Sequence, residues 1–226
     1  SSFILQAQDY NTWRYHNSYE TSTALEVSDQ AVWSASLTGL MRYDRSSGEL
    51  ETFDKTNGLS DVLIREMAWN SEVNVLIVGY GNSNIDLIDD FGNVINLPDV
   101  LNSSLTGSKL INDIYTQGTN AYLSSDFGIV VLDLINLEIE ATYVIGDNGQ
   151  SVACYDFSQA EDTLYAVTQE GLKYAFLDGS NLLDFQSWST VNASITEGIE
   201  HWNNSCFVHS SDSVYQLYSL DSLIPL

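Results

Sequence analysis

The sequence predicts an all-β protein, and within that class a β-propeller of about five four-stranded antiparallel blades. Strong helix formers are scarce beside Ser, Thr, Asn, Gly, Val, Ile and Tyr, and only 17% of the residues are charged. This composition favours short strands joined by polar turns. A chain of 226 residues is also long enough to bury its core as one all-β domain. The third observation is an internal repeat.

One strand–turn–strand unit recurs five times along the chain. It consists of an apolar strand, a short polar turn that usually holds glycine, and a second apolar strand. Copies begin at residues 32, 76, 121, 164 and 206, so they are spaced by 44, 45, 43 and 42 residues. Gly39, Gly128 and Gly171 occupy the same place in three copies, and Ser213 replaces the glycine in the last. A period of about 40–45 residues is typical of four-stranded propeller blades.

The second unit shows how each copy supplies four strands in order. We expect an inner strand at 62–69, two further strands at 75–80 and 85–89, and an outer strand at 94–100. Polar, glycine-containing turns separate the strands. Pro98 falls in the outer strand, an edge position where a missing backbone N–H is tolerated. Each unit therefore predicts one antiparallel sheet.

The two ends of the repeat leave the closure of the ring open. Residues 10–15 (YNTWRY) resemble the outer strands expected at 50–53 and 182–188, yet they precede the first inner strand at 24–27. The fifth unit is expected to end after its third strand, near Tyr218. Either residues 10–15 complete the last blade and close a five-bladed ring, or the blades are an incomplete part of a larger ring. The expected blades span residues 22–57, 58–103, 108–147, 150–190 and 194–226.

The charge balance argues against two classes of partner. The 31 acidic and 7 basic residues give a formal net charge of −24, which repels phosphate backbones and offers no anchor for an anionic membrane. We therefore expect neither nucleic-acid binding nor direct membrane insertion. The acids are spread along the whole chain, which predicts a solvated surface rather than an acidic docking patch.

The first eight residues, SSFILQAQ, resemble the end of a signal peptide, with an apolar remnant followed by small residues around Ala7. This predicts an exported protein whose propeller begins at about residue 9. Cys154 and Cys206 lie among apolar residues, in surroundings typical of buried strand positions. Two free thiols are therefore expected rather than a disulfide.

No motif predicts an enzyme, a cofactor or a metal. Residues 79–84 (GYGNSN) nearly match the dinucleotide-binding fingerprint, but the residues that follow alternate like a strand and open no helix that could hold a pyrophosphate. Cys206 and His209 are three apart in one expected strand and so point to opposite faces, which argues against a zinc site with His201. The sequence also lacks a Gly-x-Ser-x-Gly elbow and the alternating oxygen ligands of a calcium loop.

The tryptophans recur at equivalent places in the repeat. Trp13 and Trp188 lie in expected outer strands, and Trp69 and Trp202 lie late in expected inner strands. Such recurrence favours packing between blades over a platform for stacking sugars.

A ligand or partner is expected instead at the segments that cross from one outer strand to the next inner strand, since these reach the mouth of the central channel. The Asn57-Gly58 pair looks like a hairpin turn but marks such a blade junction, because its flanking strands belong to different units. The candidate contact residues are Asn57, Ser60, Asp61, Ser108, Lys109, Gln150, Ser151 and Ser194.

Several stretches resemble a known kind of propeller. The runs are AVWSASLTGLMRYD, FDKTNGLSDVLIREMAWN, LIVGYGNSNIDLID, INDIYTQGTNAYLSSDFGIVVLDL and YVIGDNGQ, and they cover most of residues 24–188. They are similar to the propeller repeat of periplasmic sensor domains in hybrid two-component regulators. They are more similar to the N-terminal propeller of PorZ-like proteins of the type IX secretion system in Bacteroidota, whose first ring has more than five blades.

The resemblance to PorZ-like proteins implies an exported, non-enzymatic propeller at the outer face of the outer membrane. It would act with other proteins of an attachment complex that joins secreted cargo to anionic lipopolysaccharide. PorZ-like proteins also carry a second propeller and a C-terminal β-sandwich. The alternative is a periplasmic ectodomain of a hybrid two-component regulator that recognises glycans.

Overall fold

The computed structural model describes residues 19, 21–104, 107–202, 205–211, 213–219 and 222–226. Over these residues the chain forms five four-stranded antiparallel sheets, here termed blades, and the strands of each blade follow one another in chain order. Blade 1 comprises β1 (Ala24–Val27), β2 (Ala31–Ala35), β3 (Gly39–Asp44) and β4 (Leu50–Asp54). Blade 2 comprises β5 (Ile64–Asn70), β6 (Val75–Tyr80), β7 (Ile85–Asp89) and β8 (Val94–Leu97).

The remaining three blades repeat this arrangement. Blade 3 comprises β9 (Ile111–Gln117), β10 (Asn120–Ser125), β11 (Gly128–Asp133) and β12 (Glu138–Tyr143). Blade 4 comprises β13 (Cys154–Ala160), β14 (Thr163–Thr168), β15 (Gly171–Phe176) and β16 (Ser189–Asn192). Blade 5 comprises β17 (Gly198–Trp202), β18 (Ser205–Ser210), β19 (Ser213–Ser219) and β20 (Ser222–Pro225). A short helix, α1 (Asp99–Asn102), and two 3-10 turns, Asp147–Gly149 and Phe185–Ser187, lie between strands.

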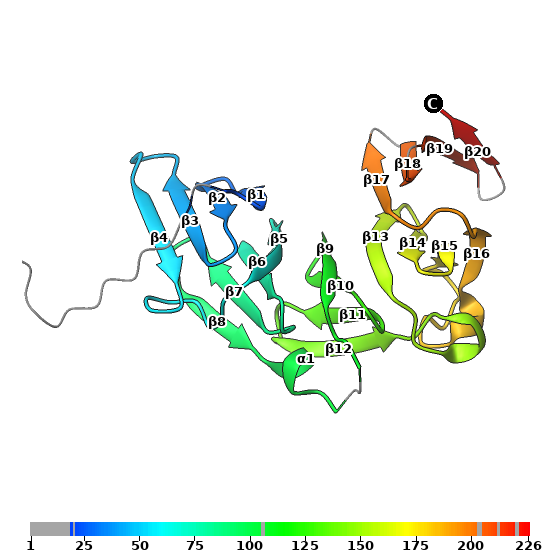
Figure 1. The fold of residues 1–226 in the computed structure, drawn as a ribbon, viewed down its shortest axis with the longest axis horizontal. Coiled ribbons are helices and arrows are strands. Elements are labelled where there is room, and N and C mark those ends of the chain that lie inside the picture. The colour runs from blue at the N-terminus through cyan, green and yellow to red at the C-terminus, as the bar shows by residue number, and fades with distance from the viewer. Residues whose placement is uncertain (1–18, 20, 105–106, 203–204, 212, 220–221) are drawn as a thin grey trace, which may run out of the picture.

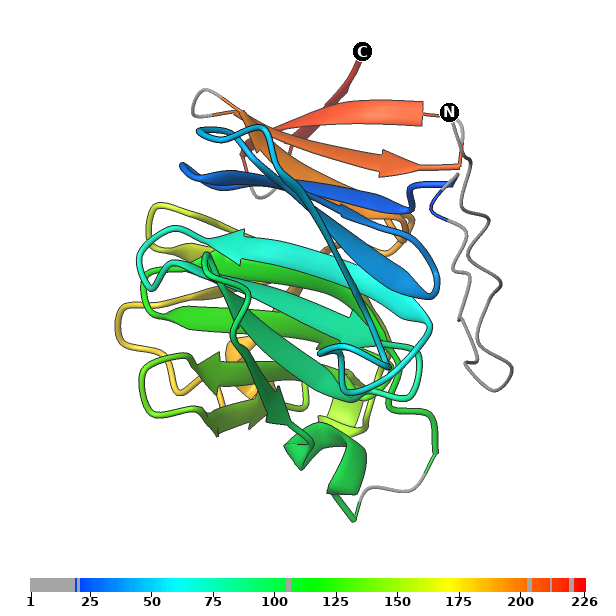
Figure 2. The same cartoon turned by 90° about the vertical axis from the view of Figure 1, so that its left-hand side faces the viewer.

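The five blades form an open arc. Figure 1 shows the inner strands β1, β5, β9, β13 and β17 on the concave side and the outer strands on the convex side, with a wide gap between blades 1 and 5. Figure 2 shows the same arc from the side of blade 1. Each inner strand contacts the next one along the chain. The predicted all-β propeller is confirmed, and the described residues form the incomplete ring rather than the closed one.

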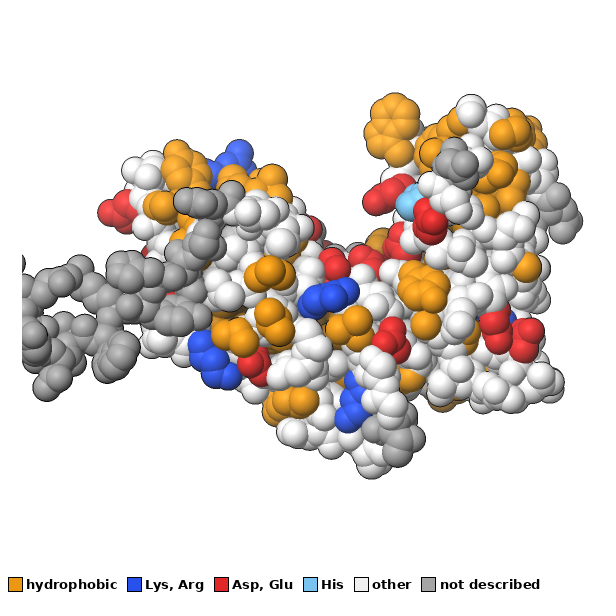
Figure 3. Space-filling view, viewed as in Figure 1, with side chains coloured by type: hydrophobic (Ala, Val, Ile, Leu, Met, Phe, Trp, Pro, Cys, Tyr) orange, Lys and Arg blue, Asp and Glu red, His pale blue; other side chains and the backbone are white. Residues whose placement is uncertain are grey.

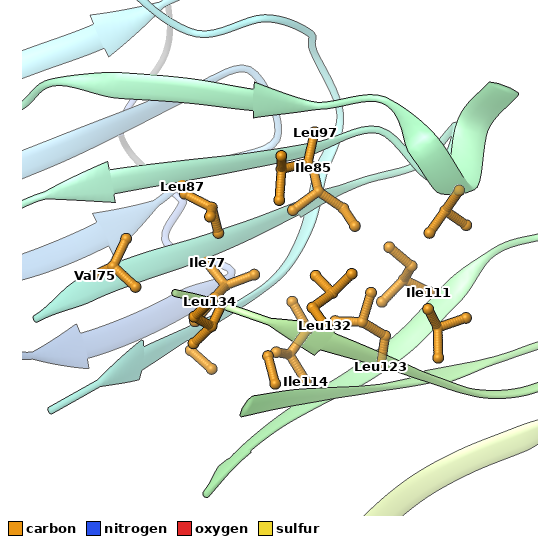
Figure 4. Packing of buried hydrophobic residues seen from close by; sticks show 14 of the residues in the cluster. Val75, Ile77, Ile85, Leu87, Leu97, Ile111, Ile114, Leu123, Leu132 and Leu134 are labelled. Atoms are coloured by element: carbon orange, nitrogen blue, oxygen red, sulfur yellow. The ribbon is translucent and has the colours of Figure 1, made fainter. Parts of the chain in front are cut away.

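The hydrophobic core lies between the blades, in four clusters that correspond to the four seams between neighbours. Figure 4 shows the seam between blades 2 and 3, where Ile77 and Leu87 of one sheet meet Ile114, Leu123 and Leu132 of the other. Sheets that pack face to face in this way exclude water from both facing surfaces. Each interior blade is therefore buried on two sides.

The burial of the second strands shows where this packing stops. Every residue of β6 is buried, and in β10 and β14 only the first residue is partly exposed. In β2 and β18, which belong to the end blades, buried and partly exposed residues alternate. Alternation is the pattern of a sheet covered on one face only. The outward faces of blades 1 and 5 are thus uncovered among the described residues.

The uncovered face of blade 1 is apolar. Val27, Val32, Tyr43 and Leu50 pair across the four strands and form one row on this face, here termed the blade 1 flank. Leu50 is 62% exposed and Val27 is 53% exposed. Single exposed apolar side chains are ordinary, but a contiguous row of them on a sheet is typical of a surface that another element covers.

The glycine of the repeat is required where two strands of a blade come close together. In three blades, a hydroxyl at or next to the end of the second strand donates to the glycine carbonyl, in the pairs Ser36–Gly39, Ser125–Gly128 and Thr168–Gly171. Gly128 has a φ of +134°, and a Cβ there would lie 2.2 Å from the Tyr143 carbonyl oxygen of the outer strand. Gly171 is similar, with φ of +110° and the Asn192 oxygen at 2.4 Å. No residue with a side chain fits these positions.

Aspartates that end the third strands account for part of the negative charge. Asp44, Asp89 and Asp133 each accept hydrogen bonds from two backbone N–H groups of the following turn. Such Asx turns replace backbone bonds that the turn leaves unmade. Hydrogen bonds from Ser46 lower the pKa of Asp44, and those from Asn136 lower the pKa of Asp133, because they stabilise the ionised carboxylate.

The prediction of an outer strand at 182–188 in blade 4 is wrong. The Asp184 carboxylate accepts from the Gln186 N–H at 3.0 Å, and the Ser187 N–H donates to the Asp184 carbonyl at 2.9 Å. These bonds fold the segment into the 3-10 turn Phe185–Ser187, so its backbone groups are not available to a strand ladder. The outer strand of blade 4 is β16, which begins one residue after Trp188.

Two further expectations about outer strands are corrected. Pro98 lies outside the outer strand of blade 2, because β8 ends at Leu97 and the Pro98 carbonyl accepts from the Asn102 N–H as α1 begins. Blade 5 does not end after its third strand, since β20 pairs with β19. Blade 5 therefore has a fourth strand of its own, and residues 10–15 lie outside the described residues.

We expect Gly128→Ala to lower the free energy of unfolding by about 3 kcal/mol, because the new Cβ would force β12 away from the start of β11. Gly118→Ala is the matched control, since Gly118 also has a positive φ, of +57°, but nothing lies within 4 Å of a Cβ there. The control should lose about 1 kcal/mol. Chemical denaturation of both variants measures the difference, and equal losses would contradict the steric explanation.

Candidate functional site

The third residue of every inner strand is an acid. These residues, here termed the acid row, are Glu26, Glu66, Asp113, Asp156 and Glu200. Because neighbouring inner strands contact each other, the row follows the concave side of the arc. Figure 3 shows acidic side chains gathered on this concave surface. The expectation that all acids form a dispersed, solvated surface therefore does not hold for Glu26, Glu66, Asp113 and Asp156, which are partly buried, whereas Glu200 is exposed.

β-Bulges precede the acid in the three middle blades. The pairing of β5 with β6 shifts between Ile64 and Glu66, and the same shift occurs between Ile111 and Asp113 in β9. In β13 the pairing with β14 shifts just before Asp156. A bulge inserts one residue and changes the direction in which the next side chain points. Because the bulge recurs in three blades, the direction of these three carboxylates is set by the backbone of the inner strands.

Two members of the row connect neighbouring blades. Burial raises the pKa of Glu26 in blade 1, and the Trp69 backbone of blade 2 offsets part of this effect. The Asp156 carboxylate of blade 4 accepts from the Ile199 N–H of blade 5 at 2.8 Å, and also from the Phe157 N–H at 2.7 Å. Bonds between a carboxylate and backbone N–H groups are stronger than neutral ones. These acids therefore join blades at the inner wall.

The row is electrostatically strained. Burial, reinforced by the neighbouring Asp156 carboxylate, raises the pKa of Asp113 to about 8. Burial also raises the pKa of Asp156 and of Glu66. Arg65 offsets part of the effect at Glu66. Like charges close together in a poorly solvated place cannot all ionise near neutral pH.

A hollow of about 310 Å³ lies between blades 3, 4 and 5, lined by Asp113, Asp156 and Glu200 together with Ser158 and His201. The Ser158 hydroxyl is 2.6 Å from His201 Nδ1, and burial lowers the pKa of His201. His201 Nε2 is buried and has no partner among the described residues. This contact joins blade 4 to blade 5 at the inner wall, and Ser158 is only 5% exposed.

A second hollow, of about 500 Å³, lies between blades 4 and 5 and has an aromatic lining that includes Tyr165, Trp202 and Tyr218. Trp202 is 70% exposed and Tyr218 is 75% exposed. The expected packing role of the tryptophans holds for Trp188, which is buried, and for Trp69, which packs against the cluster between blades 1 and 2. It is wrong for Trp202, which is the last residue of β17 and lines this hollow instead of packing in a seam between the described blades.

The candidate contact residues lie on the crossing segments, as their position between strands requires. Structural bonds occupy several of them. Asn57 accepts from the Asp54 N–H at 2.6 Å and donates to the Thr52 carbonyl at 2.8 Å. Lys109 Nζ donates to the carbonyls of Leu101 and Ser103 at 2.9 and 2.7 Å. These two residues therefore fix the path of the chain.

Most of the other candidates also have polar groups that bind to other parts of the same chain. Lys55 Nζ is 3.2 Å from the Asp61 carboxylate. The Ser194 N–H donates to Asn192 Oδ1 at 2.7 Å, and the Gln150 carbonyl accepts from the Gly146 N–H at 3.1 Å. Ser108 accepts a long bond of 3.4 Å from the Leu110 N–H, and Ser151 is exposed. A role for these residues in binding stays a prediction.

Ser60 depends on a buried carboxylate that the sequence did not single out. Asp86 is fully buried, and its carboxylate accepts from the Ser60 N–H at 2.8 Å, from the Tyr80 hydroxyl at 2.5 Å and from Asn96 Nδ2 at 2.9 Å. Burial and the nearby Asp86 charge raise the pKa of Tyr80, so its hydroxyl stays a donor. Asp86 thus fastens the first crossing segment to blade 2.

The residues considered for zinc do not converge. His201 pairs with Cys206 across β17 and β18, whereas His209 pairs with Gly198. No group of three potential metal ligands occurs in the described part of the chain. Both cysteines are buried and free. Residues 79–84 form the end of β6 and its turn, and β7 follows instead of a helix. No described helix is long and apolar enough to cross a membrane.

Blades of four antiparallel strands around an inner wall define the chain as a β-propeller module. The chain belongs to the family of PorZ N-terminal β-propeller domains. The family model described as "TSS9, PorZ, N-terminal beta-propeller domain" matches residues 32–189. The family expected from the sequence is thereby confirmed.

Solved structures agree with this assignment. PorZ of Porphyromonas gingivalis, described as an essential bacterial surface component of the type IX secretion system, matches with a TM-score of 0.77 at 24% identity, over 91% of this chain and 27% of that chain. The extracellular domain of the hybrid two-component system BT4673 from B. thetaiotaomicron matches with a TM-score of 0.65 at 16% identity, over 85% of this chain and 26% of that chain.

A third match shows how widely the fold is shared. The WD40 domain of Neurospora crassa Pan2 has a TM-score of 0.62 at 13% identity, over 90% of this chain and 64% of that chain. At such identities the likeness shows the fold, which alone does not define function. No curated protein sequence matches the chain. The chain spans only 27% of the PorZ chain.

We expect Asp86→Ala to lower the free energy of unfolding by about 3 kcal/mol, because it leaves the buried Tyr80 hydroxyl and the Ser60 N–H without their acceptor. Asp162→Ala is the control, since Asp162 is exposed and its side chain makes no described hydrogen bond. The control should change stability by less than about 0.5 kcal/mol. Denaturant unfolding measures both values, and a loss at Asp86 no greater than at Asp162 would contradict the anchoring role.

Proposed function

We propose that the chain is a non-enzymatic binding and assembly module of a PorZ-like cell-surface component of the type IX secretion system. The observation that carries this proposal is the family match over residues 32–189. The fold likeness to PorZ over 91% of the chain supports it. In this proposal the protein is exported, is associated with the outer membrane or cell surface, and contacts other proteins of the attachment complex.

The uncovered faces of the arc are the surfaces that further blades of the same protein cover. The blade 1 flank supports this, since Val27, Val32, Tyr43 and Leu50 form an apolar row across the sheet. At the other end, Ile224 of blade 5 is 44% exposed. Covering a sheet face of this kind stabilises it by about 25 cal/mol for each Å² of apolar surface buried. The incomplete ring is then one part of a larger ring.

Contact with a glycan, including the sugar part of lipopolysaccharide, belongs at the aromatic hollow rather than at the inner wall. Exposed Trp202 and Tyr218 offer flat apolar faces with polar edges. The acid row would repel anionic groups of lipopolysaccharide. The proposal therefore assigns the neutral sugars, not the phosphates or acids, to this surface.

A second candidate function is that of a glycan-sensing periplasmic ectodomain of a hybrid two-component regulator. The structural likeness to the extracellular domain of BT4673 favours it. The two functions differ in what the protein acts on, since the first concerns secreted cargo and the second concerns gene expression.

We expect deletion of residues 22–226 from the full-length protein, in its own bacterium, to abolish attachment of type IX cargo to the cell surface. Cell fractionation and immunoblotting of one cargo protein measure the effect, and an intact copy supplied in trans is the control. Cargo that remains attached, together with a lost transcriptional response to a glycan, would contradict the assembly role and support the sensor.

We expect Leu50→Ala, in the intact protein, to lower the free energy of unfolding by about 2 kcal/mol, because a covered leucine loses apolar contacts. Ile135→Ala is the matched control, since Ile135 is 61% exposed against 62% for Leu50 but lies in the turn between β11 and β12. The control should change stability by less than about 0.5 kcal/mol. Two equally small changes, measured by denaturant unfolding, would show that nothing covers the blade 1 flank.

A further inference from the structure

The seam between blades 3 and 4 joins two inner strands that each carry a poorly solvated carboxylate. β9 and β13 contact each other along this seam, and Asn112 Nδ2 donates to the Cys154 carbonyl across it at 2.9 Å. Asp113 follows Asn112 and Asp156 lies two residues after Cys154, each directly after a β-bulge. The two carboxyl groups line one hollow at this seam, and the Asp156 carboxylate acts directly on Asp113.

Most of the groups around this pair are acidic or neutral. β5 contributes Glu66 and Arg65, and β17 contributes Glu200 and His201. β13 contributes the Cys154 thiol, and β18 contributes His209, whose Nδ1 is 3.4 Å from Glu197 Oε2. Burial raises the pKa of Cys154 to about 12 and lowers that of His201. The Ile199 and Phe157 N–H groups and His209 favour ionised Asp156. The charges that act on Asp113 are all acidic, namely Asp156, Glu66 and Glu200, so ionised Asp113 has no compensating charge among the groups that act on it.

We propose that the seam between β9 and β13 is a proton-sensitive joint, closed when Asp113 is protonated and loosened when Asp113 and Asp156 are both ionised. A protonated Asp113 removes the repulsion and can donate a hydrogen bond, whereas two carboxylates at one seam repel each other in a place that water screens poorly. The seam between blades 2 and 3 also brings two bulge carboxylates together, Glu66 and Asp113, but there Arg65 offsets part of the effect of burial on the pKa of Glu66. The joint would set how firmly blades 1–3 are held to blades 4 and 5.

The sign of the pH dependence follows from the pKa of Asp113. Its pKa is raised from 3.8 to about 8 in the folded chain. Between these values the folded state holds a proton that the unfolded or opened state releases. The seam therefore loses stability as pH rises from about 4 to about 8, and changes little above that.

Hydrogen exchange on the intact protein tests the joint directly. Protection factors of β9 and β13 amides are compared at about pH 5.5 and about pH 8.5, after correction for the intrinsic pH dependence of exchange. We expect the protection of the wild type to fall by about tenfold or more at the higher pH, since one pKa unit corresponds to a factor of ten. In Asp113→Asn, which mimics the protonated acid, the fall should be less than about threefold.

Asp133→Asn is the control, because it removes an acid from the same blade at the outer turn. It should lose protection in β9 and β13 as the wild type does. A melting temperature of Asp113→Asn within about 2 °C of the wild type at pH 5.5 shows that the variant folds normally. Equal protection of the wild type at both pH values would overturn the proposal. So would an equal loss in Asp113→Asn, or a loss in the wild type that extends to β6 in blade 2.

Discussion

A sheet with two apolar faces needs a neighbour on each side, and this constraint governs the whole structure. β6 is buried along its entire length because blades 1 and 3 cover both faces of blade 2. Each seam has its own hydrophobic cluster, and each cluster joins two blades that follow one another along the chain. Stability is then a sum of blades and seams, as in other repeat architectures. The end blades, with one seam each, are the least supported members of the arc.

The acidic residues of this chain fall into two groups whose pKa values are shifted in opposite directions. Asp44 and Asp133 end third strands at the surface, where hydrogen bonds lower their pKa, so the stability they contribute is present above about pH 4 and is lost as pH falls. Asp113 and Asp156 lie at the inner wall, where burial raises the pKa. The net charge of −24 therefore includes carboxylates that stabilise the fold more at high pH and carboxyl groups that stabilise it more at low pH.

The architecture could be predicted from the sequence because the repeat is clearest in the strands that are buried on both faces. The strands expected at 75–80 and 85–89 coincide with β6 and β7, whose apolar runs are long and bounded by turn residues. Outer strands were predicted less well, because they have one exposed face and local side-chain bonds compete with the ladder, as Asp184 does before the 3-10 turn of blade 4.

The acid row was missed although it has a clear signal. Its members lie 40, 47, 43 and 44 residues apart, close to the period of the repeat, and each is the third residue of an inner strand. Composition alone treats them as five among 31 acids. Their proximity depends on how the blades curve round one another, and their direction depends on bulges that pairing creates, so neither follows from a single unit of the sequence.

The crossing segments have a mechanical consequence. Because every blade has an even number of strands in chain order, the chain passes from blade to blade on one face only, through segments such as 55–63 and 144–153. On that face the chain itself links each blade to the next, whereas on the opposite face only side-chain contacts hold neighbouring blades together. Any spreading of the blades is therefore directional: it opens the unlinked face and pivots on the linked one.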